Sequence, residues 1–317
     1  MADPAQRRAY TPNEDKVIRL WAAYKTSKRL TAVQAAKLLK YSSSTMTQVE
    51  AGTYPSAPDG VLKAMKRVID NERRRDAAIK DAPFAVTSAY EQVEATCTLC
   101  FEGGMFGVIE GPSGAGKTMS VNAFAEKHPG DVILITCSLG YSGEPLLEDI
   151  AEHLRLRLHG RIHRKLRQVC EELTVRGKPL IIIDEADKLT SRGFQAGRTV
   201  WDDVHCGMIF VGTPDFRANI AKNATGLDQQ GFNRFSEVCQ VGTVNEEDAE
   251  KITRFFNVPM AARRLAFKAC GGDARLLNDG MKRAVTIARE TGGNADEVCV
   301  QAAFMTLRDF RDLSRRA

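Results

Sequence analysis

The stretch GPSGAGKT, residues 111–118, decides the fold of this chain. The apolar run FGVI at 106–109 predicts a strand before it, and residues 117–124 predict a helix after it. Strand, glycine-rich loop and helix in this order are typical of a phosphate-binding loop. The stretch matches the pattern G-x-x-x-x-G-K-[ST], whose fixed positions here are Gly111, Gly116, Lys117 and Thr118.

The residue types of this loop suit a nucleoside triphosphate. Glycines allow several backbone N–H groups to approach a polyphosphate, and the start of the following helix adds a positive end. Lys117 would neutralise β- and γ-phosphate oxygens, and the hydroxyl of Thr118 would hold Mg²⁺. The loop therefore predicts a nucleoside triphosphate with Mg²⁺ as its ligand.

A second motif, KPLIIIDEADKL at 178–189, supplies two carboxylates. Its apolar run predicts a central parallel strand, and Asp184 and Glu185 follow at the carboxyl end, where such sheets bind ligands. We expect Asp184 to reach Mg²⁺ through water and Glu185 to polarise the attacking water. The expected nucleotide site comprises Gly111, Pro112, Ser113, Gly114, Ala115, Gly116, Lys117, Thr118 and Asp184, of which Thr118 and Asp184 serve the metal.

The order of elements around these motifs identifies a wider resemblance. Further strands are predicted at 131–138, before the second motif, and at 207–213, after it. A helix is predicted at 144–158, between the first of these strands and the second motif. Alternating strands and helices that carry both motifs resemble the AAA+ ATPases. The resemblance implies an α/β core with a parallel sheet at 85–243, which binds and hydrolyses ATP, and a helical lid at 244–317.

The same resemblance implies three further site residues. Thr213 stands where the family has a polar residue that senses the γ-phosphate, often Asn. Arg234, in GFNRFSEV, resembles the arginine finger given to a neighbouring subunit; a structural salt bridge is the alternative role, and Arg217 is the second candidate. Arg275, in GGDARLL, resembles the lid arginine that reaches the nucleotide, with an ordinary arginine at a helix start as the alternative.

Composition narrows the classes of protein to which this chain can belong. The chain has 317 residues with 43% hydrophobic content, enough for two or three domains with sizeable cores. No uninterrupted apolar stretch approaches the ~18 residues of a membrane span, so none is expected. The eight cysteines are scattered except for Cys97 and Cys100. We expect a reducing cytoplasm, with these two thiols buried on a helix rather than used for zinc or redox chemistry.

Positive charge is concentrated at the start of the chain. Residues 1–80 hold 16 Lys and Arg against 8 Asp and Glu, whereas residues 81–243 hold 16 against 21. Residues 244–317 hold 13 against 11. A basic N-terminal region predicts an acidic partner such as nucleic acid.

The N-terminal region also contains a recognisable pair of helices. Residues 30–52 predict two short helices with a break at 40–42, and they resemble the helix-turn-helix of phage repressors, although Lys40 stands where that family usually has Gly. The resemblance implies double-stranded DNA as partner of the second helix. This helix offers only short hydroxyls and one amide, which predicts little sequence specificity. A protein-docking module is the alternative. The residues expected to face DNA are Ser43, Ser44, Thr47 and Gln48. This domain is expected at 1–75 and a linker at 76–84.

A second basic cluster lies within RLRLHGRIHRKLR, residues 155–167. Spacings of three and four residues predict that Arg157, Arg161, Arg164 and Lys165 share one helical face. Contact with phosphate backbone and an ordinary solvated face are both open interpretations.

The full order of parts resembles the phage Mu B transposition protein family. The resemblance implies a chain that binds ATP between subunits, polymerises as a helical filament on duplex DNA, and stimulates a transposase. Hydrolysis would then drive disassembly. Two alternatives use the same parts: an ATP-switched transcription regulator that binds an operator, and a helicase loader.

Overall fold

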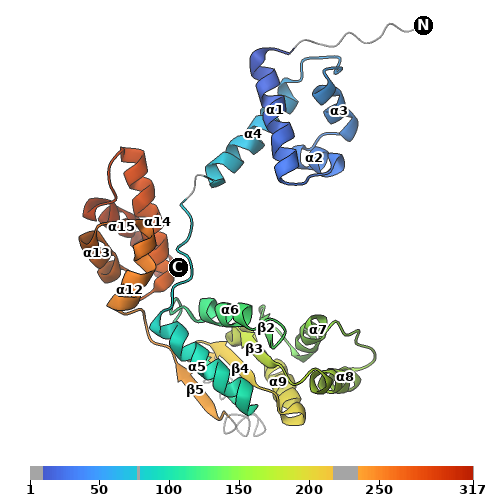
Figure 1. Cartoon of the computed structure of the whole chain (residues 1–317), viewed down its shortest axis with the longest axis vertical. Coiled ribbons are helices and arrows are strands. Elements are labelled where there is room, and N and C mark those ends of the chain that lie inside the picture. Colours follow the sequence, from blue (N-terminus) through green and yellow to red (C-terminus); the bar gives the residue numbers. More distant parts are fainter. Residues whose placement is uncertain (1–9, 77–78, 217–234, 317) are drawn as a thin grey trace. The chain divides into compact units, whose positions relative to one another are not determined.

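A computed structural model describes residues 10–76, 79–216 and 235–316. The chain divides into two compact units, Met1–Ile79 and Lys80–Ala317, which we describe separately (Figure 1). No helix among the described residues is long and apolar enough to cross a membrane.

The first unit is a small helical domain with one core. Trp21 and Val49 are fully buried there, and the indole N–H of Trp21 donates to the Glu50 carboxylate at 3.1 Å. Thr11 and Thr31 each begin a helix with a complete capping box, which satisfies N–H groups that a helix start leaves unpaired. Its helices are α1 (Pro12–Ser27), α2 (Ala32–Leu39), α3 (Ser43–Ala51) and α4 (Asp59–Asp76).

The predicted break between the two short helices is a tight turn. Lys40 ends α2 in the left-handed region, with φ 62° and ψ 37°, and Ser42 caps α3 by accepting from the backbone N–H of Thr45 at 3.0 Å. Lys40 thus adopts the conformation that glycine usually supplies.

We expect Lys40→Gly to raise the free energy of unfolding of the first unit by about 1 kcal/mol, because glycine has no Cβ to strain at this φ. Urea unfolding followed by tryptophan fluorescence measures it. Lys37→Gly, a matched change inside α2, should instead lower stability by about 1 kcal/mol. Equal losses from both variants would contradict the strain at Lys40.

The second unit is built on a five-stranded sheet. All neighbouring strands are parallel, in the order β2-β3-β4-β1-β5. β1, β3 and β4 are buried at every position, which explains their continuous apolar sequences. The strands are β1 (Phe106–Glu110), β2 (Val132–Thr136), β3 (Leu180–Asp184), β4 (Met208–Gly212) and β5 (Glu237–Gln240).

Helices cover both faces of this sheet (Figure 1). Alternate residues of β3 serve the two faces: Ile181 and Ile183 pack in the cluster of α7, α8 and α9, and Ile182 packs in the cluster of α5 and α6. Burial of each such side chain stabilises the fold by about 1.5–3 kcal/mol. The helices are α5 (Ser88–Gly103), α6 (Lys117–Lys127), α7 (Gly143–His153), α8 (Ile162–Val175) and α9 (Ser191–Val204), and the short η1 (Ala186–Lys188) follows β3.

The residues after the sheet, which the sequence predicted as a helical lid, form helices. Asn245 caps its first helix by accepting from the Asp248 N–H at 2.8 Å. Close packing of two helices depends on Gly280, because a Cβ there would lie 2.2 Å from the Phe304 ring. The lid elements are α12 (Glu246–Thr253), η2 (Arg254–Phe256), α13 (Met260–Cys270), α14 (Ala274–Thr291) and α15 (Glu297–Arg316).

One sequence expectation needs correction. The helix expected at 144–158 ends at His153, because Arg155 turns into the left-handed region with φ 53°. Within the stretch predicted as a linker at 76–84, Asp81 accepts from the Lys282 ammonium at 2.7 Å and from the Asn278 amide at 2.6 Å. The polar sequence of this stretch therefore serves contacts with α14 as well as solvent.

Cys97 and Cys100 are buried in α5 as small core residues. Burial raises the pKa of both thiols, that of Cys100 to about 12, so neither is a reactive thiolate at neutral pH.

Candidate nucleotide site

The phosphate-binding loop lies between β1 and α6. Gly114 and Gly116 adopt φ values of 79° and 91°, which side chains other than glycine rarely do. Gly111 is also required, because a Cβ there would lie 2.4 Å from the Val241 carbonyl oxygen. α6 begins at Lys117, so its free N-terminal N–H groups lie at the end of the loop, where an anion binds.

Lys117 lies over the loop that precedes it. Its ammonium donates to the carbonyl oxygens of Gly111 at 2.7 Å and Pro112 at 2.9 Å. Burial lowers the pKa of Lys117, while the charges of Asp184, Asp187 and Glu185 act in the opposite direction. The ammonium thus lies against the phosphate-binding loop, where the charges of three carboxylates act on it.

Asp184 ends β3 with an incompletely satisfied carboxylate. Only 3% of the residue is exposed; Oδ1 accepts from the Glu185 N–H at 2.8 Å, and buried Oδ2 has no hydrogen-bond partner among the described residues. Burial raises the pKa of Asp184, and the Thr118 hydroxyl and the Glu185 N–H oppose this shift. A buried carboxylate oxygen without a partner is costly unless a cation or donor approaches it.

This arrangement fits a magnesium ion brought with a nucleotide. Asp184 and Thr118 offer oxygen ligands, which Mg²⁺ prefers. The described residues contain no group of three or more His, Cys, Asp or Glu side chains that could hold a metal by themselves. Phosphate oxygens and water would therefore supply the remaining ligands, and the ion would neutralise phosphate charge.

Glu185 follows Asp184 in a strained backbone conformation. Its φ of 54° lies in the left-handed region, and its side chain is 43% exposed, 3.3 Å from the Lys188 ammonium. Strain of this kind is common where a side chain must be directed into a site. Glu185 is therefore accessible at the carboxyl end of the sheet, as its expected role requires.

Thr213 directly follows β4 and is bound to a residue that the sequence interpretation missed. The Thr213 hydroxyl donates to Asp187 Oδ1 at 2.6 Å, and the Thr213 N–H lies 3.0 Å from Oδ2. Asp187 is the last residue of the D-E-A-D sequence, so its position three residues after Asp184 was the available signal.

The first turn of α14 contacts the phosphate-binding loop. The Ala274 N–H donates to the Gly114 carbonyl oxygen at 2.9 Å, and Asp273 Oδ1 lies 2.3 Å from where a Gly114 Cβ would stand. Arg275 is the next residue of this helix and is exposed. The structure thus brings the helix that carries Arg275 to the loop, and it adds Asp273, which also caps that helix.

The residues expected to face DNA in the first unit share one exposed face of α3. Met46 and Val49 are buried on the opposite side. Thr47 donates its hydroxyl to the Ser43 carbonyl oxygen at 3.0 Å. The exposed set is Ser43, Ser44, Thr47 and Gln48.

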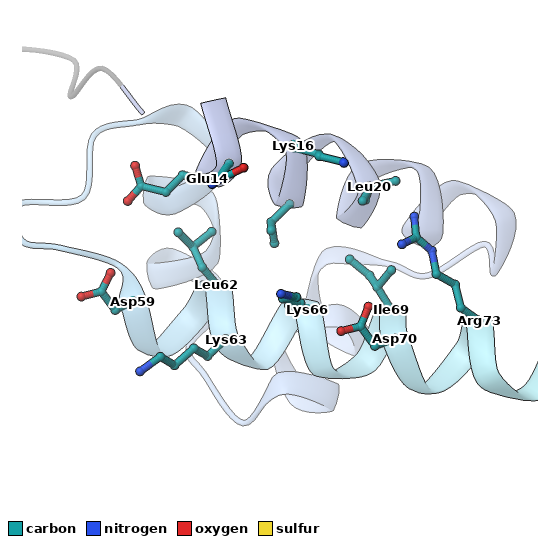
Figure 2. A pocket seen from close by; sticks show the side chains of 12 residues that line it. Glu14, Lys16, Leu20, Asp59, Leu62, Lys63, Lys66, Ile69, Asp70 and Arg73 are labelled. Carbon is teal, nitrogen blue, oxygen red and sulfur yellow. The ribbon is translucent and has the colours of Figure 1, made fainter. Parts of the chain in front are cut away.

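A separate groove of about 470 Å³ lies between α1 and α4 (Figure 2). Leu62 and Ile69 line it among charged residues of both signs. Its lining therefore does not present a surface of a single charge sign. Its charged residues are Lys16, Lys63, Lys66, Arg73, Glu14, Asp59 and Asp70.

The expected basic face at 155–167 is not a single helical face. Arg157 lies in the segment between α7 and α8, Arg161 caps α8, and Arg164 lies in its first turn, all three exposed. Lys165 instead pairs with Glu144 at 2.5 Å and Glu148 at 2.8 Å. The prediction was wrong in this respect because Arg155 ends α7 early and Gly160, at φ 90°, redirects the chain.

Arg234 and its alternative Arg217 lie outside the described residues. Both remain candidates from the sequence alone.

Comparisons with known proteins agree with this geometry. Residues 101–220 match the family model of the AAA domain. The ORC2 protein of Aeropyrum pernix is similar over 71% of this chain and 70% of its own, at 15% identity and a TM-score of 0.55. A RuvB mutant of Thermotoga maritima is similar over 72% of this chain and 74% of its own, at 13% identity and a TM-score of 0.50. No curated protein matches the sequence.

The second unit therefore contains an AAA domain with the α/β fold of P-loop ATPases. At these identities the solved structures establish the fold alone.

Proposed function

We propose that this chain is an ATP-driven switch that assembles on duplex DNA with little sequence preference, activates a transposase and leaves DNA after hydrolysis. ATP would bind the phosphate-binding loop with Mg²⁺ at Thr118 and Asp184. Glu185 would polarise the attacking water, and Arg234 of one subunit would complete the site of the next. The Aeropyrum pernix ORC2 structure of similar fold was solved as ADPNP and ADP complexes, which supports an adenine nucleotide as the ligand of this chain.

The main observation in support of a switch is the hydrogen bond from the Ala274 N–H to the Gly114 carbonyl oxygen. It joins the lid to the backbone that would hold phosphates, so a bound nucleotide and the lid share one contact. A nucleotide that binds one lid position better shifts the population toward that position. Arg275, at the start of the same helix, would respond to the γ-phosphate.

Two exposed surfaces support DNA as the assembly partner. The α3 face offers hydroxyls and one amide, which contact phosphates but discriminate bases poorly. Arg157, Arg161 and Arg164 add positive charge to an otherwise acidic core. Binding that depends on phosphate contacts should fall steeply with salt.

Electron microscopy and footprinting with ATP test this function on several unrelated duplexes. Helical filaments and extended ATP-dependent protection on every duplex are expected. A single short protected site would contradict filament assembly and favour an operator-binding regulator instead. Capture of a replicative helicase without DNA protection would favour a loader.

We expect Arg164→Ala to weaken DNA binding and to reduce the slope of log affinity against log salt by about 1, as loss of one phosphate contact does. Lys165→Ala is the matched neighbour, and it should leave the slope unchanged because Glu144 and Glu148 already pair with that charge. Fluorescence anisotropy across a salt series measures both. An equal change in slope for the two variants would refute the assignment of Arg164.

A further inference from the structure

The segment before α5, residues 81–88, is bound to the lid at both of its ends. At the first end, Asp81 accepts from the Lys282 ammonium at 2.7 Å and from the Asn278 side-chain amide at 2.6 Å. The side-chain oxygen of Asn278 accepts from the Ala82 N–H at 3.0 Å. Asn278 thus uses both its donor and its acceptor on consecutive residues, so it binds the backbone of this segment as well as its charge.

The second end of the segment is bound in the interior. Asp248, on α12, accepts from the Ser88 N–H at 2.8 Å and from the Ser88 hydroxyl at 2.6 Å. Asp248 is only 2% exposed, whereas the side chain of Asp81 is 71% exposed. Exposed ion pairs are weak, but a buried carboxylate that loses its donors is costly. We therefore expect the Asp81 end to open while the Ser88 end stays closed.

The residues that bind the Asp81 end belong to the helix that contacts the phosphate-binding loop. The first turn of α14 makes that contact, through the Ala274 N–H and the Gly114 carbonyl oxygen at 2.9 Å. Ala274, Asn278 and Lys282 are four residues apart, so they follow one another along one side of α14. Because α14 is one continuous helix, a movement of its first turn carries Asn278 and Lys282 with it.

Phosphates at the loop would disfavour this position of the first turn. The Asp273 carboxylate lies against the loop, with Oδ1 2.3 Å from where a Gly114 Cβ would stand. A bound triphosphate would bring its own negative charge beside this carboxylate, and like charges repel each other. The lid position that binds Asp81 therefore competes with a triphosphate on the loop.

We propose that the contacts of Asp81 and Ala82 with α14 form a latch, which ATP binding opens and whose opening strengthens DNA binding. This proposal rests on the ATP-dependent DNA binding proposed above. ATP would favour the lid position in which Asn278 and Lys282 no longer bind the segment. DNA binding would strengthen ATP binding in return, because coupling between two ligands acts equally in both directions.

The latch sets the length of the connection between α4 and the next bound residue. α4 ends at Asp76, so four residues, 77–80, precede a closed latch. When the latch is open, the next ring contact along the chain is that of Phe84 with Tyr90, 4.9 Å between centroids, and the connection grows to seven residues, 77–83. Seven residues reach nearly twice as far as four. A longer connection allows the α3 face and the exposed core arginines to bind one duplex together, which is tighter than either contact alone.

Hydrogen exchange at the Ala82 amide tests the latch directly, because a closed latch protects this N–H through Asn278. The full chain is compared without nucleotide, with ADP and with a non-hydrolysable ATP analogue. We expect the analogue to speed exchange at Ala82 by about fivefold or more, the lower end of typical coupling between two sites. The Ser88 amide, bound to buried Asp248, is the internal control and should stay protected. Unchanged exchange at Ala82 would overturn the proposal.

Two variants that open the latch change the net charge in opposite directions. Without nucleotide, Asp81→Ala and Lys282→Ala should each bind DNA about fivefold more tightly than the wild-type chain, and the ATP analogue should add little. Charge alone would instead weaken binding in Lys282→Ala, which loses a cation. Fluorescence anisotropy with one duplex measures both variants. The exchanged pair Asp81→Lys/Lys282→Asp should restore the dependence on ATP.

Glu247→Ala is the matched control for Asp81→Ala. It also removes one carboxylate from an exposed pair of the lid, that of Glu247 with Lys251 at 3.1 Å, and it should keep the wild-type response to ATP. A wild-type response in both latch variants would overturn the proposal, and so would changes in affinity that follow net charge alone. A wild-type chain whose DNA affinity does not depend on ATP would instead overturn the proposed function, and the latch with it.

Discussion

Lys117→Ala should abolish ATP binding at nucleotide concentrations that saturate the wild-type protein. The ammonium is the positive side chain that lies over the phosphate-binding loop, 2.7 Å from the Gly111 oxygen. Loss of a charge-assisted contact costs about 1.5–3 kcal/mol, and the three carboxylates that act on Lys117 would then face the phosphates without its compensation. We therefore expect affinity to fall by roughly 10²-fold or more.

The control for this variant lies at the other end of the same helix. Lys127 ends α6 and pairs with Glu94 at 2.9 Å, on the Tyr90 side of the helix. Lys127→Ala should bind ATP normally, and both variants should give a single cooperative thermal transition. Titration with a fluorescent ATP analogue measures affinity, and electron microscopy with DNA measures assembly. Retained binding in a folded Lys117→Ala protein would contradict the assignment of the loop.

Local sequence patterns predicted those parts of the fold that local chemistry determines. The apolar runs at 106–109 and 180–183 fall within β1 and β3 because strands buried on both faces carry continuous apolar sequence. The break at 40–42 was also visible, although Lys40 provides the left-handed residue in place of glycine.

Features that depend on distant contacts were not visible in the sequence. α7 ends at His153 because Arg155 adopts a left-handed conformation, after which the Leu156 N–H donates to the Ala151 carbonyl oxygen at 2.8 Å. Leu154 is buried at this end, and the Arg176 guanidinium donates to its carbonyl oxygen at 2.8 Å. The spacing of the basic residues at 155–167 does not reveal these contacts.

The residues of the nucleotide site divide in the same way, into those that local motifs predict and those that distant contacts bring together. Asp184 and Lys117 belong to motifs with fixed spacing, so the sequence placed them together. Asp273 reaches the loop only because the lid folds back onto it, 159 residues after Gly114 in the chain. Asp187 was hidden for a different reason: its partner Thr213 lies 26 residues away, directly after β4, whereas Asp187 lies in η1 after the neighbouring β3. Pairing between neighbouring parallel strands is a tertiary property that no local pattern specifies.

Glu185→Gln should separate ATP binding from hydrolysis. The amide keeps the shape of the side chain but accepts a proton poorly, so we expect hydrolysis to slow by about 10²–10⁴-fold, the usual contribution of a general base. ATP affinity should persist, because Lys117, Thr118 and the loop backbone are unchanged. Stability should also persist, since the lost pair with Lys188 spans 3.3 Å between two half-exposed side chains and is worth about 0–1 kcal/mol.

We expect filaments of the Glu185→Gln variant to persist on DNA. If ATP favours the DNA-bound state, a protein that cannot hydrolyse it stays in that state after free ATP is removed. Filament lifetime after dilution into buffer without nucleotide, followed by light scattering, measures this directly. Glu172→Gln is a matched control, because Glu172 pairs with Arg176 at 2.8 Å on the surface of α8. If Glu185→Gln filaments disassembled as fast as Glu172→Gln filaments, Glu185 would not determine when the protein leaves DNA. Persistent filaments with normal hydrolysis would show that release is timed by a later step than the chemistry.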